Sequence, residues 1–280
     1  MRMAVTIRPL TSSIGAEVDG VQLAALDDAD AGSLRTSLAE HGVLVFPRQE
    51  LTREQQVEAT ARFGAVHGHP VPEFLFGAAD PVAVVENDAD KRPQEDQQFH
   101  VDYSFSTEIP DLAVLHAEVL PPNGGDTMWS NAGAAYDALS PRMQEFLDGL
   151  TARHDAGEKF WWEMRLTLGE ESSEKAREHF QGNSHSIVCA HPVTGRKVLF
   201  VNPGYTVAIN ELNRSESAGV LRMLFEHLGN PAFHYRHRWS DSDVVMWDEH
   251  LTAHMGPFDF APHRRRLARV TAGSTAPVAA

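Results

Sequence analysis

Short runs rich in β-branched and aromatic residues recur along this chain, and they restrict its fold more than any other feature. Each run has the length of an ordinary strand and is bounded by turn-forming residues, which is typical of an antiparallel β protein. The runs that we predict to be strands are Ala4–Leu10, Gly42–Phe46, Val82–Val85, Leu112–Leu120, Ser186–Ala190, Val198–Val201, Phe233–Trp239, Asp243–Trp247 and Arg265–Thr271. Two turn sequences, His191–Arg196 and Ser240–Asp243, each predict a hairpin between the runs on either side.

A smaller number of segments have helical patterns with recognisable ends. Thr52 with Gln55 three residues later forms a capping box, and Ser140 before Pro141 is a typical helix start. The predicted helices are Asp28–His41, Thr52–Phe63, Pro141–Leu150 and Asn213–Leu228, the last of which ends at Gly229. Many short strands and a few helices favour a mainly β fold, a sandwich or barrel with helices outside.

The segment from about residue 157 to 185 departs from this pattern. It is charged, lacks the alternation of a strand, and carries Phe160, Trp161 and Trp162 in a row. An insertion of this kind predicts either a lid over a site or a helical excursion whose aromatic side chains pack on the core. The sequence does not decide between the two. We otherwise expect residues 1–280 to form one domain.

Charge and cysteine content restrict the class of partner and the compartment. The formal net charge is −15, and binding nucleic acid needs a basic surface, so we expect no nucleic-acid partner. The one cysteine, Cys189, cannot form an intramolecular disulfide. No run of about 18 apolar residues and no apolar leader is present. We therefore expect a cytoplasmic protein without membrane contact. The sequence leaves open whether it forms a homo-oligomer, such as a dimer or tetramer.

The sequence offers a candidate metal site in Phe99-His100-Val101-Asp102. In an extended chain, residues two apart point to the same face, so His100 and Asp102 could hold one ion, with His254 as a third ligand. Two histidines and one carboxylate leave coordination positions open, which is the arrangement of non-haem Fe(II) oxygenases. A zinc hydrolase could use the same set. In a chain with 15 histidines, an H-x-D triplet alone also arises by chance.

Two arginines on one predicted strand indicate an anion. Arg265, Leu267 and Arg269 share a face of the strand Arg265–Thr271. Inward-facing guanidinium groups need anionic partners, and arginine binds carboxylates and sulfonates well. Thr127, which starts a strand after Gly124-Gly125, could join Arg265 on one carboxylate. The alternative is that both arginines form structural salt bridges.

These motifs together resemble the taurine dioxygenase family of Fe(II)/2-oxoglutarate oxygenases. The motifs that match in order and spacing are His100-x-Asp102, Gly124-Gly125-Asp126-Thr127, Trp247-Asp248, His254, and Arg265 with Arg269. Similar stretches occur at 7–16, 62–64 and 191–202, so the resemblance covers nearly the whole chain. It implies a double-stranded β-helix, or jelly roll, with flanking helices.

The resemblance also implies the chemistry. His100, Asp102 and His254 are implied to bind Fe(II), where O₂ reacts, and Thr127 and Arg265 to hold the distal carboxylate of the cosubstrate 2-oxoglutarate. Its oxidative decarboxylation would release succinate and CO₂ and hydroxylate the substrate. Related halogenases lack the carboxylate ligand, so the presence of Asp102 favours hydroxylation. A non-catalytic protein that binds a metal or small anion on the same fold is the alternative.

The same resemblance implies an anionic substrate. The residues implied to line its pocket are His69, Arg269, Phe160, Tyr205, Tyr103 and Asp96. His69 and Arg269 match the pair that binds the sulfonate of taurine, although His69 could instead be a structural loop histidine. Pro72, Asp96 and Lys159 stand where the family has tyrosine, asparagine and serine, which changes the hydrogen bonds available. We therefore expect a small sulfonate, sulfate ester or carboxylate, with taurine not the best substrate.

Overall fold

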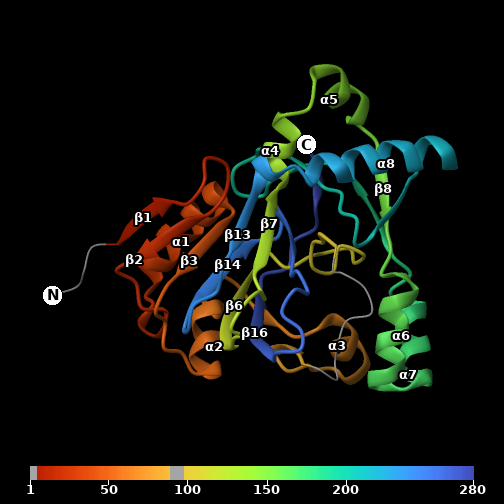
Figure 1. The fold of residues 1–280 in the computed structure, drawn as a ribbon. Coiled ribbons are helices and arrows are strands. Elements are labelled where there is room, and N and C mark those ends of the chain that lie inside the picture. The colour runs from red at the N-terminus through yellow and green to blue at the C-terminus, as the bar shows by residue number, and fades with distance from the viewer. Residues whose placement is uncertain (1–4, 89–97) are drawn as a thin grey trace.

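The computed structural model describes residues 5–88 and 98–280, and two sheets form its centre (Figure 1). The larger sheet contains, in spatial order, β1 (Thr6–Pro9), β2 (Ala16–Asp19), β3 (Val43–Phe46), β14 (Val244–Asp248), β6 (Leu112–Val119), β16 (Arg265–Ala272) and β4 (Val66–His67), with β5 (Ala83–Asn87) also paired to β16. The smaller sheet contains β13 (His234–His237), β7 (Thr127–Asn131) and β15 (Thr252–Met255). This is the predicted double-stranded β-helix.

Further strands and the helices surround these two sheets. One additional sheet contains β11 (Lys197–Leu199), β10 (Val188–Ala190) and β17 (Val278–Ala279), and another contains β12 (Thr206–Ile209), β8 (Thr151–His154) and β9 (Asn183–Ser186). The α-helices are α1 (Asp28–His41), α2 (Arg53–Ala61), α3 (Pro70–Phe76), α4 (Ala132–Asp137), α5 (Pro141–Leu147), α6 (Gly157–Leu168), α7 (Glu170–His179) and α8 (Arg214–Leu228). Two 3₁₀ turns, η1 (Leu23–Ala25) and η2 (Pro231–Phe233), complete the described elements.

Large apolar side chains fill the space between the two central sheets. Trp129 of β7 packs in one cluster with Trp247 of β14 and Leu267 of β16, and each is at most 1% exposed. On the other face of the larger sheet, side chains of α1 and α2 pack against β3. Because both faces of β3 are covered, every residue of Val43–Phe46 is buried. This explains why its sequence is continuously apolar instead of alternating.

Helices α1, α2, α5 and α8 confirm the four predicted helices. The hydroxyl group of Thr52 accepts the N–H of Gln55 at 3.2 Å, and the Gln55 side chain accepts the N–H of Thr52 at 2.9 Å, which is the predicted capping box. Helix α5 begins after Ser140 as predicted but ends at Leu147, earlier than expected. The short helices α3 and α4 were not predicted, because so few residues show little apolar periodicity.

One of the two predicted hairpins is present and the other is wrong. The turn at His191–Arg196 joins β10 and β11, which pair antiparallel. At Ser240–Asp243 the chain does turn, and the Asp243 carboxylate accepts the N–H of Ser240 at 2.9 Å. However, β13 pairs with β7 and β14 pairs with β3 and β6, so this turn carries the chain from one sheet to the other. The predicted strand Ser186–Ala190 is likewise divided between β9 and β10 of different sheets.

The segment at about 157–185 forms α6 and α7, which lie together beside α3 at one edge of the molecule (Figure 1). Phe160 and Trp161 of α6 pack in a cluster with Val71 of α3 and with Phe105. Trp162 is 46% exposed. Two of the three consecutive aromatic side chains therefore contact the core, and the third is about half exposed.

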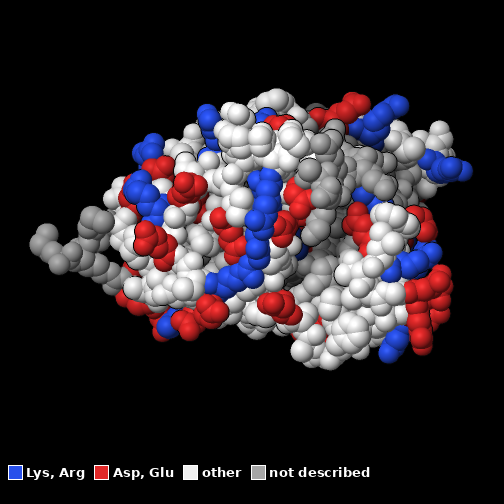
Figure 2. Space-filling model, turned by 60° about the horizontal axis from the view of Figure 1, so that its bottom comes forward, with Lys and Arg blue, Asp and Glu red and all other residues white. Residues whose placement is uncertain are grey.

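The surface carries charges of both signs. On the face shown in Figure 2, Lys and Arg side chains form a narrow band with Asp and Glu side chains along it. Exposed ion pairs include Arg8–Glu17, Arg62–Asp28 and Arg142–Glu145. Within the two described ranges, no helix has the length and apolar character needed to cross a membrane.

Helix α8 provides a test of its local stabilisation. Asn213→Ala removes the side chain that accepts the N–H groups of Ser215 and Glu216 at 3.0 and 3.1 Å, and we expect it to lower the free energy of unfolding by about 1 kcal/mol. Gly219→Ala places a methyl group in open space on the exposed side of the helix, and we expect a gain of roughly 0.5–1 kcal/mol. Urea denaturation measures both changes, and shifts of the same sign would contradict the roles given to these two residues in α8.

Candidate metal centre and anion-binding residues

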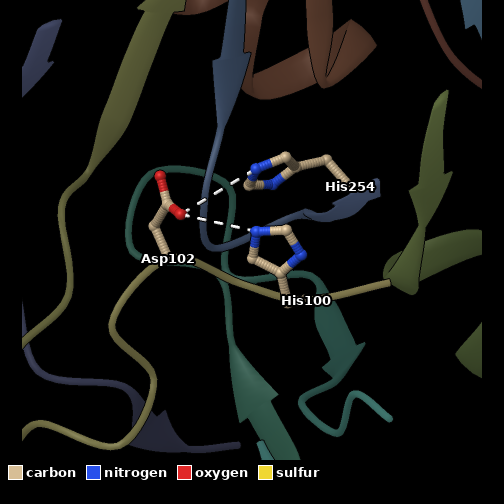
Figure 3. A group of neighbouring side chains, drawn as sticks. All are labelled: His100, Asp102 and His254. Carbon is tan, nitrogen blue, oxygen red and sulfur yellow. Dashed lines mark ion pairs between the residues drawn. The ribbon is translucent and has the colours of Figure 1, made fainter. Parts of the chain in front are cut away.

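His100, Asp102 and His254 form a compact group (Figure 3). His254 lies on β15, and His100 forms an isolated bridge with it through two backbone N–H···O=C bonds of 2.9 and 2.8 Å. Asp102 lies in a turn, so the shared face of an extended strand is not what brings it to His100. The ligand atoms of the three residues nevertheless lie within 4.8 Å of one another.

The donor atoms of this triad fit a divalent metal ion. Asp102 Oδ1 lies 3.7 Å from His100 Nε2 and 3.9 Å from His254 Nε2. Two atoms that each bind one ion at about 2.1 Å lie roughly 3–4 Å apart when they are neighbours around it. His100 Nδ1 lies 2.9 Å from the carbonyl oxygen of Gln98, which leaves Nε2 free for a metal. Burial, followed by His100, lowers the pKa of His254, so this imidazole is neutral, as a ligand must be.

Asp102 is buried and paired with Arg269 of β16. Arg269 Nη1 donates to both carboxylate oxygens, at 2.9 and 2.7 Å, and Nη2 donates to the Tyr103 hydroxyl at 3.0 Å. Burial alone would raise the pKa of Asp102, but Arg269 and the two histidines lower it to about 2. Asp102 is therefore a carboxylate at neutral pH. For Arg269, the structural salt bridge considered from the sequence is present.

Glu249 is a buried acid of this site that the sequence motifs did not identify. It follows β14 and is fully buried. Its Oε2 accepts the N–H of Asp102 at 3.1 Å, and its Oε1 accepts the indole N–H of Trp247 at 2.7 Å. Burial and then the charge of Asp102 raise the pKa of Glu249 well above its ordinary value. Of the two neighbouring acids, Asp102 therefore holds the negative charge.

Arg265 and Thr127 lie together at a second polar position. Arg265 Nη2 donates to Thr127 Oγ1 at 3.1 Å, and Nε donates to the carbonyl oxygen of Gly125 at 2.7 Å. Arg265 is 5% exposed, and burial lowers its pKa to about 10. The nearby charges of Asp126 and Asp259 oppose this effect of burial. No carboxylate in the described part of the chain forms an ion pair with it. A buried cation without a bonded carboxylate is a candidate position for binding an anion.

Two glycines allow the backbone to approach the site closely. A Cβ atom on Gly125 would lie 2.9 Å from Pro121 Cγ and 3.0 Å from Arg265 Cδ, and its φ of +73° also favours glycine. A Cβ atom on Gly204 would lie 2.7 Å from the Cβ of His100. Side chains at these positions would displace the arginine or the histidine, which explains the second glycine of the Gly124-Gly125 motif.

The residues expected to contact substrate gather beside Arg269. His69 is the N-cap residue of α3, and its ring centre lies 5.1 Å from that of Tyr103 and 6.0 Å from that of Phe160. Tyr205 lies edge-on to His100 at 5.9 Å. Burial, followed by Arg269, lowers the pKa of His69 to about 4, so its ring is neutral at neutral pH. Arg269 lies 5.8 Å from the Tyr103 ring centre, and Tyr103 packs in one cluster with Phe160 and Tyr205.

The positions that depart from the family pattern are only partly described. Pro72 is half-buried on α3, and Lys159 is exposed on α6. Asp96 lies outside the described residues. The effect of these three residues on the choice of substrate therefore stays a prediction.

A buried polar network supports the turn that carries Asp102. Ser104 Oγ lies 3.0 Å from His154 Nδ1 and 3.2 Å from Asn202 Nδ2. His185 Nε2 lies 2.9 Å from the carbonyl oxygen of Ser104. These side chains are at most 5% exposed. Because hydrogen bonds from three separate segments of the chain converge on Ser104, the turn has little freedom to move.

The same network predicts that stability falls in acid. Burial and then His185 lower the pKa of His154 to about 3, whereas in the unfolded chain this residue takes up a proton below about pH 6.5. Between about pH 7.5 and pH 5 the unfolded state binds more protons, so we expect His154 to reduce the free energy of unfolding by roughly 1–2 kcal/mol. Urea denaturation over this range should show a shallower pH dependence for His154→Gln, and an unchanged slope would contradict the assignment.

Comparison with known proteins shows which family the chain resembles over its whole fold. Residues 6–271 match the family described as taurine catabolism dioxygenase TauD, TfdA family. The chain is 33% identical over 280 residues to the (S)-phenoxypropionate/alpha-ketoglutarate-dioxygenase of Sphingobium herbicidovorans, covering 94% of this chain and 93% of that protein. It is 27% identical over 281 residues to the alpha-ketoglutarate-dependent sulfate ester dioxygenase of Pseudomonas putida, covering 99% and 92%.

A solved structure agrees with the same assignment. The crystal structure of a taurine dioxygenase from Burkholderia xenovorans is similar with a TM-score of 0.81 at 29% identity, covering 99% of this chain and 93% of that one. The range matched to the family includes the three candidate metal ligands and both inward-facing arginines. The similarity therefore extends over the part of the chain that carries the candidate site.

Proposed function

The chain belongs to the TauD, TfdA family and is a 2-oxoglutarate-dependent dioxygenase, and we propose that it uses Fe(II), 2-oxoglutarate and O₂ to hydroxylate a small anionic organic substrate. Succinate and CO₂ are the proposed co-products. The observation that carries this proposal is Arg265, a buried guanidinium bonded to Thr127 and Gly125 but to no carboxylate of the described residues. A dicarboxylic cosubstrate would supply the missing anion.

The protein's own residues bind and orient the reactants. His100, Asp102 and His254 would hold Fe(II) and leave its other positions open. Arg265 and Thr127 would bind the distal carboxylate of 2-oxoglutarate through charge-assisted hydrogen bonds. Bound iron, 2-oxoglutarate and O₂ supply the oxidising power for hydroxylation.

We place the anionic head group of the substrate between Arg269 and His69. The Nε–H of Arg269 is buried and has no hydrogen-bond partner in the described ranges. His69 Nδ1 accepts the N–H of Val71 at 3.2 Å, so the neutral ring carries its proton on Nε2 and can donate it. The N–H groups of Arg269 Nε and His69 Nε2 thus have no assigned acceptor. Such a pair of donors, of which Arg269 is a cation, suits a carboxylate, sulfonate or sulfate oxygen.

The surroundings of this head-group site favour an apolar or aromatic tail. Phe160 and Tyr205 border it, and Phe105 lies 5.3 Å from each of them between ring centres. Burial raises the pKa of Tyr205, so its hydroxyl is neutral. Relatives that this chain resembles are named for (S)-phenoxypropionate and for sulfate esters. We therefore propose an anion with an apolar tail in preference to the ammonium group of taurine.

We further propose a single catalytic domain in which the segment at about 157–185 acts as a lid. Support comes from Phe160, which α6 presents to His69 at a ring distance of 6.0 Å. As a lid, this segment would cover the bound substrate and open without unfolding the central sheets.

The cosubstrate assignment predicts the effect of Arg265→Ala. Removing the cation that binds the distal carboxylate should weaken 2-oxoglutarate binding by roughly 2–5 kcal/mol. The affinity for the substrate should change much less. The measurement is the weak visible charge-transfer band that forms from Fe(II) and 2-oxoglutarate without O₂, followed by succinate release on adding O₂ and substrate. Arg266→Ala is the matched control, because Arg266 faces outward and pairs with Glu118 at 2.8 Å. Unchanged dependence on 2-oxoglutarate in Arg265→Ala would overturn the assignment.

The head-group assignment predicts which substrates are preferred and how a change of His69 weakens their binding. Phenoxyalkanoic acids, alkyl sulfates and longer alkyl sulfonates should have a higher kcat/KM than taurine in one preparation. His69→Asn keeps an acceptor for the start of α3 but removes the Nε2–H, and it should raise the KM for anionic substrates about tenfold. Taurine as the best substrate would refute the tail assignment, and an unchanged KM for anionic substrates in His69→Asn would refute the head-group assignment.

A further inference from the structure

We propose that Trp239 is a positioning residue for 2-oxoglutarate, because its indole N–H fixes the direction in which Thr127 donates its hydroxyl proton. This inference rests on the proposed function and concerns the same carboxylate. Trp239 Nε1 donates to Thr127 Oγ1 at 3.0 Å. Trp239 lies between β13 and the turn that leads to β14, far along the chain from the other residues of the cosubstrate site.

The hydroxyl group of Thr127 can form only a limited number of hydrogen bonds. A threonine hydroxyl has one proton to donate and two lone pairs that accept. Both lone pairs of Thr127 are used, one by Arg265 Nη2 at 3.1 Å and the other by Trp239 Nε1 at 3.0 Å. Its proton can then only point away from these two donors, and no described group accepts it. An anion held by Arg265 lies next to this proton and supplies the missing acceptor.

Trp239 is held rigidly enough to act in this way. Its side chain is 9% exposed and packs in the cluster between the sheets. The His237 ring lies edge-on to it, with ring centres 4.7 Å apart. His237 is itself placed by the Tyr235 hydroxyl, 2.9 Å from its Nδ1, and by Asp243, 3.2 Å from its Nε2. The indole N–H therefore has one available direction, toward Thr127.

The consequence is specific to the distal carboxylate. In Trp239→Phe one lone pair of Thr127 becomes free, so its hydroxyl can rotate and no longer presents its proton only to the ligand. We expect about tenfold weaker binding of 2-oxoglutarate, the effect of one hydrogen bond to a charged group. Pyruvate shares the metal-binding end of 2-oxoglutarate but lacks the distal carboxylate, and its binding should not change.

The experiment measures binding without turnover. Wild type and variants are loaded with Mn(II), which supports binding without oxidation, and titrated calorimetrically with 2-oxoglutarate and with pyruvate. Trp129→Phe is the matched control, because this indole lies in the same core but its N–H has no partner in the described residues. Should Trp239→Phe fail to fold, 3-benzothienylalanine at position 239 replaces the N–H by sulfur and keeps the shape.

A double-variant comparison separates positioning from a general loss of structure. Thr127→Val removes the hydroxyl, so adding Trp239→Phe to it should weaken 2-oxoglutarate binding no further. A full additional loss in that background, an equal loss for pyruvate, or wild-type binding in Trp239→Phe would each overturn the inference. Arg265→Ala distinguishes the two proposals: if it too binds 2-oxoglutarate like wild type, the cosubstrate site itself is misplaced. A loss in Arg265→Ala without one in Trp239→Phe overturns the role of Trp239 alone.

Discussion

Two guanidinium groups on the inner face of β16 impose the constraint on which the rest of the site depends. A buried cation without an anion costs free energy comparable to the whole stability of a domain, so each arginine requires a partner. Arg269 has one within the chain, in Asp102. Arg265 contacts only uncharged oxygens among the described residues. The same strand therefore carries one completed ion pair and one arginine for which we propose that 2-oxoglutarate supplies the anion.

The completed pair determines the charge of the candidate metal site. Arg269 keeps Asp102 ionised although it is buried, and burial together with that same charge raises the pKa of the adjacent Glu249. Burial keeps His254 neutral, which leaves its ring nitrogen able to bind an ion. The hydrogen bonds of Ser104 with His154 and Asn202 hold the turn that carries Asp102 in place. Protonation states and positions are thus set by the protein before any ligand binds.

Local patterns in the sequence predicted the parts of this site that depend on local geometry. The two-residue period of a strand correctly placed Arg265 and Arg269 on one face. The residue types of His100 and Asp102 indicated a metal site, although a turn and a bridge to β15 bring them together. The hairpin at Ser240–Asp243 was wrong because turn residues show that a chain reverses but not which strand it then pairs with. Glu249 was missed because its role depends on a backbone N–H distant in sequence.

The ion pair between Arg269 and Asp102 also restricts how enzymes built on this site can diverge. A substitution at Arg269 that suited a new substrate would at the same time release Asp102, the proposed carboxylate ligand of the metal, so one mutation would change two properties. Selection for new specificity should therefore act on side chains that border the pocket without touching the metal ligands, such as those of α3 and α6. In a lineage of such enzymes, the arginine should change slowly while the surrounding rings and helix positions change quickly.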